Sequence, residues 1–329
     1  MNQPALVALL AKEFRTQMRG SRPAVLLASY LALLLLALFW LYQTLVGQVQ
    51  QGVPLIGPQI GQALFVGLTL AVQLLLVFLA PATTLNSISS EHERHTYDIL
   101  LATPLSAAGM VLSKLLVGVA FVGLLIIAAL PLYSIVVLFG GVAVGDLGRV
   151  VLTIISTAIT GCTLGLACSV LTRQTYTATL LCYTVLVAVT AGTLFAANIW
   201  SALHGLAAAP SSYLVANPLS AAASALGQAQ PPGIVTVNAL RPATLLGLLT
   251  RGSLNLNVNE LAPPFFRATW LLYSGVALSL LWVALHTVEA HQHRRFLRFS
   301  RSDAWLLGLL VLWAALVWAT QAWWQTGLW

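Results

Sequence analysis

Long apolar runs alternate with short polar segments along the whole chain. A helix that crosses the hydrocarbon core of a bilayer needs about 20 predominantly apolar residues. Runs of this kind lie near residues 24–46, 61–85, 112–139, 150–171, 176–199, 268–288 and 305–327. The pattern predicts an all-α polytopic membrane protein with six spans in its main part and an additional seventh span near the C-terminus.

Composition supports this interpretation and narrows the possible partners. Of the 329 residues, 59% are hydrophobic and 7% are charged, against about 25% charged residues in a typical soluble domain. The net charge of +7 does not indicate a nucleic-acid partner, because the basic residues lie in separate loops. Cys162, Cys168 and Cys182 fall inside predicted spans, where we expect them to pack without forming disulfides or a metal site.

The distribution of basic residues predicts the orientation of the chain. Lys and Arg near the ends of spans stay on the cytoplasmic side. With a cytoplasmic N-terminus, only Arg149, Arg241, Arg251 and Arg267 are external. The other eleven basic residues are then cytoplasmic: Lys12, Arg15, Arg19, Arg22, Arg94, Lys114, Arg173, Arg294, Arg295, Arg298 and Arg301. We therefore predict a cytoplasmic N-terminus and an uncleaved first span that serves as a signal anchor.

Three regions flank or interrupt the spans. Residues 1–22 have an apolar face opposite a charged face, which predicts an amphipathic interfacial helix; it is either a simple anchor or an elbow that borders a cytoplasmic partner. The predicted transmembrane domain occupies 23–290 and includes an external segment at about 200–267. Residues 291–329 combine a basic cytoplasmic stretch with the additional transmembrane helix.

The external segment is neutral and rich in Ala, Pro, Gly and Asn. A short helix is predicted after Pro218, a break at the "PPG" of 231–233, and a second short helix in "RPATLLGLLTRG" at 241–252. Pieces of this length cannot span a bilayer. They are either interfacial or re-entrant helices that line an exit, or parts of an ordinary lid-like loop.

Several kinds of chemistry have no support in the sequence. The chain has no G-x-x-x-x-G-K-[ST] loop for ATP phosphates, and no Asp or Glu in the central part of a predicted span, where ion-coupled carriers place a relay. His92 and His95 are three residues apart, not four as in a His-Glu-x-x-His zinc site. We therefore expect no catalytic residue, no cofactor and no metal.

The most informative segment is the charged island 86–114, "NSISSEHERHTYDILLATPLSAAGMVLSK", between the second and third spans. Its charged residues are interleaved with Tyr97, Leu100 and Leu101 at helical spacing, and Pro104 cannot continue a helix. We predict a short helix at about 88–103 across the cytoplasmic mouth. It is either a solvated connection or an amphipathic helix that docks into a groove.

This island resembles the corresponding segment of the ABC-2 family of ATP-binding cassette exporter permeases. The resemblance is carried by Glu91, Glu93, Arg94, Thr96, Leu100, Leu101, Thr103, Pro104, Leu105 and Lys114. His95 stands where the family usually has Gly. "NPL" at Asn217–Leu219 is also similar to the family's external segment.

The resemblance implies a six-helix, type V exporter-like transmembrane domain in a prokaryotic plasma or inner membrane. The 88–103 helix would be the coupling helix that binds a separate ATPase subunit, and a second permease copy or a paralogue would complete the transporter. The implied partner-binding residues are Glu91, Glu93, Arg94, Thr96, Tyr97, Leu100, Leu101, Thr103 and Pro104.

Two other functions remain open from the residues. A membrane scaffold or assembly protein would bind a cytoplasmic partner through the same island without moving solute, and a secondary carrier would work without ATP. The substrate is also open among lipids, hydrophobic drugs, peptides and lipid-linked glycans. The spans are apolar, with Gln62, Gln73 and Asn198 as rare polar groups.

Overall fold

The structure is a computed structural model that describes residues 21–50, 57–95, 107–172, 174–205, 209–226, 248–250, 264–293 and 301–325. All regular secondary structure in these ranges is helical, as predicted. Six helical segments are long and apolar enough to cross a membrane. They are α2 (Ser21–Gln50), α3 (Gly57–Leu85), α6 (Ala107–Leu138), α7 (Val144–Leu171), the segment α8 (Thr175–Val187) to α9 (Thr193–His204), and α12 (Phe266–His293).

Helix α7 is the centre of the bundle and packs against α3, α6, α8 and α12. In the most hydrophobic 18-residue stretch of α7, 61% of the residues are buried. The corresponding value is 11% in α2, which lies at the edge of the bundle. Small residues allow the closest approach: a Cβ at Gly165 would lie 2.4 Å from the carbonyl oxygen of Pro81 in α3. The α3–α7 pair is therefore the closely packed centre around which the other spans are placed.

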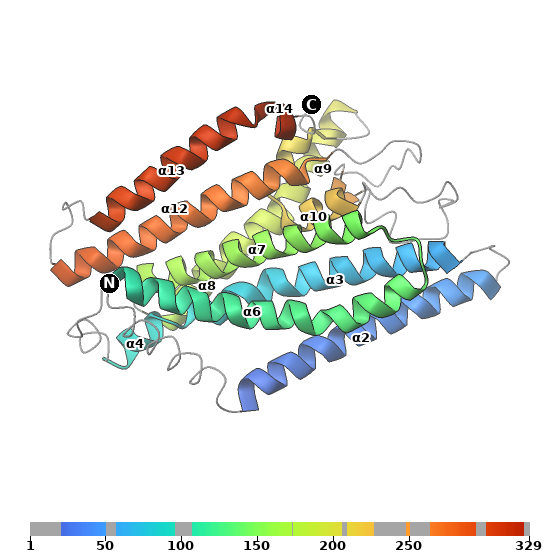
Figure 1. Ribbon diagram of the computed structural model, residues 1–329, viewed down its shortest axis with the longest axis horizontal. Coiled ribbons are helices and arrows are strands. Elements are labelled where there is room, and N and C mark those ends of the chain that lie inside the picture. Colours follow the sequence, from blue (N-terminus) through green and yellow to red (C-terminus); the bar gives the residue numbers. More distant parts are fainter. Residues whose placement is uncertain are drawn as a thin grey trace.

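Successive spans run in opposite directions, so the connections gather at two ends of the molecule (Figure 1). One end carries α4 (Ser89–Glu93), the start of α6 and the α7–α8 turn. The opposite end carries α9 and α10 (Pro218–Leu226). We call them the α4 end and the α10 end. This alternation agrees with the topology that the sequence predicts.

The C-terminal part forms α13 (Arg301–Ala319) and α14 (Gln321–Trp324). α13 lies along α12 (Figure 1), where the Trp313 ring covers Gly275 and its indole nitrogen donates to the Ser274 hydroxyl at 2.9 Å. The apolar stretch Ala304–Ala319 is shorter than the six spans. The predicted continuous span 305–327 is thus interrupted at Thr320, between α13 and α14.

Other predicted boundaries differ in the segment after the fifth span. α9 extends to His204, so this span passes through residues that the sequence assigned to the external segment. α10 begins at Pro218 as predicted. Of the second predicted helix, at 241–252, only residues 248–250 are described, and these are helical. The predicted interfacial helix lies almost wholly in residues 1–20, outside the described part of the chain.

Candidate functional site

The candidate site is the short helix α4, which follows α3 at the α4 end. Its first backbone amides would lack partners inside a helix of five residues. The Ser169 hydroxyl, near the end of α7, accepts hydrogen bonds from the backbone nitrogens of Ile88 at 3.0 Å and Ser89 at 2.9 Å. A side chain of the central helix therefore caps α4 and fixes where it begins.

Lys114 connects the same segment to α6. Its Nζ donates to the Ser87 carbonyl at 2.7 Å and lies 3.8 Å from Glu91 Oε1. The Lys114 side chain is only 6% exposed, and that of Glu91 is 28% exposed. An ammonium group at such a depth requires acceptors, and this carbonyl and carboxylate provide them. Lys114 thus holds the α3–α4 turn against the third span.

Glu93 connects α4 to α8. Its Oε1 accepts a hydrogen bond from the backbone nitrogen of Thr175, the first residue of α8, at 2.7 Å. A carboxylate at the N-terminus of a helix satisfies an otherwise unpaired amide and interacts favourably with the helix dipole. The Thr175 hydroxyl also lies 3.3 Å from that of Ser89. α4 is therefore bonded to the first residue of the fifth span.

α4 ends at Glu93, and the chain turns at His95. His95 has φ of +55°, the left-handed conformation that costs a residue with a Cβ about 1–2 kcal/mol. This is the position where the resembling family usually has Gly. The sequence predicted one helix over about 88–103. That helix is instead interrupted at His95, because the backbone leaves the helical conformation at this residue.

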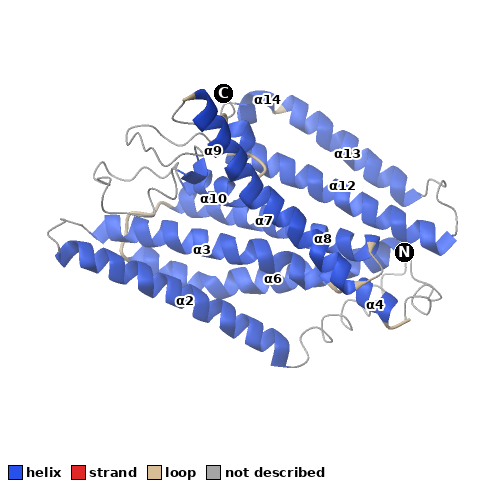
Figure 2. Ribbon diagram, turned by 180° about the vertical axis from the view of Figure 1, so that it is seen from behind, coloured by secondary structure: helices blue, strands red, loops and turns tan. Residues whose placement is uncertain are grey.

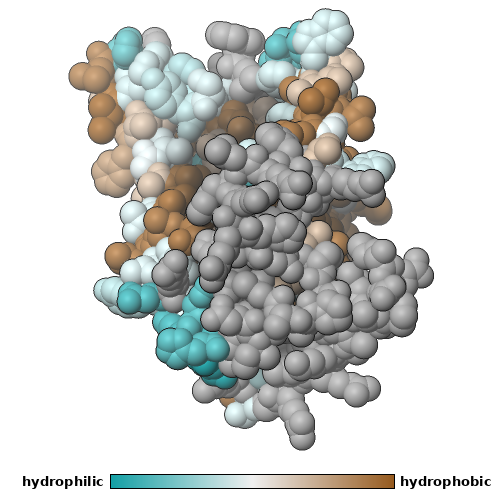
Figure 3. All heavy atoms as spheres, turned by 90° about the vertical axis from the view of Figure 1, so that its left-hand side faces the viewer, coloured by the Kyte–Doolittle hydropathy of each residue, from teal (hydrophilic) through white to brown (hydrophobic). Residues whose placement is uncertain are grey.

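The structure brings three of the predicted partner-binding residues together. Glu91, Glu93 and Arg94 lie within one turn of chain, with the side chains of Glu93 and Arg94 exposed. Figure 3 looks onto this end and shows hydrophilic residues gathered beside the apolar bundle. The remaining predicted residues lie outside the described part of the chain: Thr96, Tyr97, Leu100, Leu101, Thr103 and Pro104.

Sequence reasoning missed Ser169 and Thr175, the residues that receive α4 from α7 and α8. Both lie near the ends of predicted spans, where hydroxyl residues are common and carry no distinctive signal. Their role depends on a contact with residues more than 80 positions earlier in the chain. Only the packing of α3 against α7 brings them to α4.

At the opposite end, Asn217 organises the entry into α10. Its Oδ1 accepts from the backbone nitrogens of Leu219 at 2.9 Å and Ser220 at 3.2 Å, which is the bonding expected of an N-cap. Its Nδ2 donates to the Thr190 carbonyl at 2.7 Å and the Thr193 hydroxyl at 2.9 Å. Asn217 therefore joins α10 to the fifth span.

The Thr190 carbonyl belongs to a π-helical turn, η1 (Ala188–Gly192), between α8 and α9. A π-turn interrupts the regular bonding of the α-helix and occurs frequently at functional sites. Here the wider turn presents a carbonyl to the Asn217 amide. The fifth span is thus irregular at the point where the external segment binds it.

α10 itself lies between the spans at the α10 end of the bundle. Each residue from Ser220 to Leu226 is at most 2% exposed, and the helix packs against α3, α7 and α12. Gln73 Nε2, in α3, donates to the Thr157 hydroxyl at 2.8 Å and the Pro218 carbonyl at 3.1 Å. This piece of chain is thus a helix buried between the spans, and its re-entrant placement in a membrane stays a prediction.

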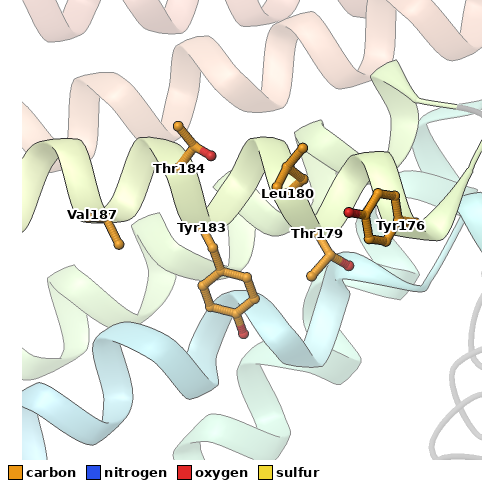
Figure 4. Close-up of a pocket in the computed structure, with 6 residues that line it drawn as sticks. All are labelled: Tyr176, Thr179, Leu180, Tyr183, Thr184 and Val187. Carbon is orange, nitrogen blue, oxygen red and sulfur yellow. The ribbon is translucent and has the colours of Figure 1, made fainter.

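One face of α8 borders an open groove of about 460 Å³ (Figure 4). The face combines aliphatic, aromatic and hydroxyl side chains. These are Tyr176, Thr179, Leu180, Tyr183, Thr184 and Val187. Tyr176 is 75% exposed and Leu180 is 58% exposed. The groove runs from the α4 end along the fifth span, and no other helix of the described chain lines it.

Comparison with known proteins adds one finding. A family model described as ABC-2 family transporter protein matches residues 7–304. A search among curated proteins finds no significant match. The family match includes all six spans, α4 and α10.

Proposed function

Because the chain belongs to the ABC-2 family of transporter proteins and is therefore a membrane permease component of an ABC transporter, we propose that it is the permease subunit of an ATP-driven exporter. It is a multi-pass membrane protein. A separate ATPase subunit supplies the energy and binds the cytoplasmic segment that begins with α4. In this proposal the partner hydrolyses ATP and the permease is the non-catalytic subunit.

The observation that supports this proposal best is the set of contacts around α4. The helix continues from α3, receives a cap from Ser169 of α7, and is bonded to α6 through Lys114 and to α8 through Glu93. A displacement of α4 by a partner therefore acts on four spans at once. A coupling element needs such connections, because a partner can shift the spans between two conformations only through contacts that differ between those conformations.

The exposed side of α4 offers the docking contacts. Glu91 and Glu93 are engaged by Lys114 and by the N-terminus of α8, so their main role in the isolated subunit is to hold α4. Arg94 is exposed beside them and is suited to a carboxylate on the ATPase, because guanidinium groups bind carboxylates in a bidentate manner. We assign Arg94 as the main charged contact among the described residues.

The face of α8 in Figure 4 supports a paired arrangement. In the most hydrophobic 18-residue stretch of the fifth span, only 22% of the residues are buried within one chain. We propose that a second permease copy or a paralogue faces this groove and that substrate passes between the two chains. The aliphatic and hydroxyl side chains suit a largely apolar substrate with some polar groups.

The sharpest test uses Arg94, because its replacement leaves the internal contacts of α4 intact. Arg94→Glu is expected to reduce co-purification with the cognate ATPase at least tenfold, or to abolish substrate-dependent stimulation of ATP hydrolysis. The matched control Arg94→Lys retains the charge and is expected to lose much less. If Arg94→Glu binds the ATPase and couples like the parent, the docking proposal is wrong.

Transport in membrane vesicles distinguishes the exporter from the scaffold alternative. With the ATPase present, an exporter moves substrate only when ATP is on the ATPase side. A scaffold binds the ATPase without any ATP-dependent movement of substrate. Accumulation that follows an ion gradient in the absence of ATP would contradict both and indicate a secondary carrier.

A further inference from the structure

A second hollow lies inside a single chain, between α8 and α12. Both helices pack on α7 but barely touch one another, which leaves a cavity of about 160 Å³. α7 forms its floor at Thr157, Gly161 and Leu164, and Ala216 and Pro218 close it toward the α10 end. We call it the α8–α12 cavity.

The cavity has an apolar interior although four hydroxyl residues line it. Each hydroxyl group donates its proton to a nearby carbonyl: Thr157 to Thr153 at 2.9 Å, Thr160 to Ser156 at 2.8 Å, Thr190 to Leu186 at 2.7 Å, and Tyr273 to Ala216 at 2.9 Å. The other lining side chains are aliphatic, apart from Gly161. An occupant therefore finds no free hydroxyl proton, and the mostly aliphatic lining favours an apolar molecule.

The mouth of the cavity opens on the exposed apolar surface of two helices that are apolar and long enough to cross a membrane. Val185 of α8 and Leu272 and Val276 of α12 line the cavity and are 37–39% exposed. α8 and α9 lie on the outside of the bundle, nearest the viewer in Figure 2. The hydrocarbon tails of the bilayer are thus the apolar molecules that meet this opening.

The volume sets the size of the occupant. An engineered apolar cavity of about 150 Å³ stays dry and binds benzene, a ligand of six carbon atoms. The α8–α12 cavity has room for a similar number of carbon atoms in a narrow space between two helices, which suits the end of a single alkyl chain.

We propose that the α8–α12 cavity binds the terminal part of one phospholipid acyl chain. The chain enters between Val185 and Val276 and ends against Thr190 and Pro218. There it contacts both elements that Asn217 joins, the π-turn η1 and the start of α10. This binding requires neither the ATPase nor transport.

The test uses a phosphatidylcholine with a photoreactive diazirine at the methyl end of one acyl chain, in vesicles that contain the permease alone. Leu186 lines the cavity and is 8% exposed, whereas Ile127 of α6 lies outside the cavity and is 63% exposed. Lipid on the outer surface labels Ile127, and only a chain inside the cavity labels Leu186. We expect Leu186 to be labelled at least as strongly as Ile127.

Two tryptophan variants provide the comparison. Val276→Trp fills the mouth and is expected to reduce the labelling of Leu186 at least fivefold. Leu181→Trp places the same ring at an exposed site on α8 outside the cavity and is expected to leave it unchanged. If Val276→Trp does not fold, Val189→Phe replaces it with the same expectation.

Unlabelled Leu186 in the parent, or labelling that persists in folded Val276→Trp, would overturn the proposal. A free fatty acid with the same diazirine, added at equal concentration, tests the source of the chain. Stronger labelling of Leu186 by the fatty acid than by the phospholipid would contradict a phospholipid as the occupant.

Discussion

The two ends of the bundle hold their short helices in different ways. α10 is buried in the mouth, and its fully enclosed cap residue, Asn217, makes four hydrogen bonds. α4 has five residues, an exposed outer side, and contacts through single hydroxyl, ammonium and carboxylate groups.

This difference bears on how the two ends behave. Regions with few buried apolar contacts and exposed hydrogen bonds open locally at low free energy, whereas buried elements open only with the whole fold. We therefore expect α10 to stay in place and α4 to move more readily, which suits the coupling role proposed for α4. A coupling mechanism needs such an asymmetry, because force applied at α4 then changes the spans instead of unfolding the opposite end.

The largest effect is expected at α10. Asn217→Ala removes the cap and leaves buried groups of Thr190 and α10 without partners, which should lower the free energy of unfolding by about 2–4 kcal/mol. Thermal unfolding of the purified protein measures this. Asn198→Ala is the control, since the Asn198 amide donates to the Leu194 carbonyl of its own helix and bonds no other element within the described residues. Equal melting of the two variants would contradict the role of Asn217.

A smaller and local effect is expected at α4. Ser169→Ala leaves the amides of Ile88 and Ser89 without their acceptor, which costs about 1–2 kcal/mol. Because α4 is held independently of α10, we expect faster hydrogen exchange in α4 with little change in melting temperature. Ser156→Ala is the control, because in the part of the chain that the structure describes this hydroxyl bonds within α7, to the Thr153 carbonyl. Unchanged exchange at Ser89 would show that Ser169 does not hold α4.

The smallest effect is a gain of stability at the end of α4. His95→Gly removes the Cβ from a left-handed residue and should stabilise the turn by about 1 kcal/mol, visible as slower hydrogen exchange around Arg94. His92→Gly, inside the helix, should have the opposite sign because Gly destabilises helices by a similar amount. Loss of stability in His95→Gly would mean that the His95 side chain makes a contact of greater value.

The sequence predicted the spans well, because a run of apolar residues that must cross a bilayer has few alternatives. The start of α10 was also predictable, since Asn followed by Pro suits an N-cap and the first helical position. The π-turn at Ala188–Gly192 had no sequence signal. The early end of α4 was indicated only by His95 at a position where the resembling family has Gly.

The contacts of the candidate site were less predictable than the site itself. The resemblance to the ABC-2 segment implied Glu91, Glu93 and Arg94 as partner-binding residues, but the sequence could not distinguish an exposed charge from one bound within the chain. The partners of Glu91 and Glu93 depend on how α6 and α8 meet α4, and local patterns do not encode that geometry. Lys114 was recognised as the entry of the third span, and its bond to Ser87 came only from the structure.

The central claim is that the α4 end faces the cytoplasm and binds the ATPase. Labelling of His95→Cys with a membrane-impermeant thiol reagent tests it most directly, because His95 is exposed beside Arg94, the Arg94 guanidinium is kept, and the three native cysteines are buried. We predict no labelling in intact cells, strong labelling in inside-out vesicles stripped of the ATPase, and protection when the ATPase is restored. Labelling of intact cells, or no protection by bound ATPase, would contradict the account.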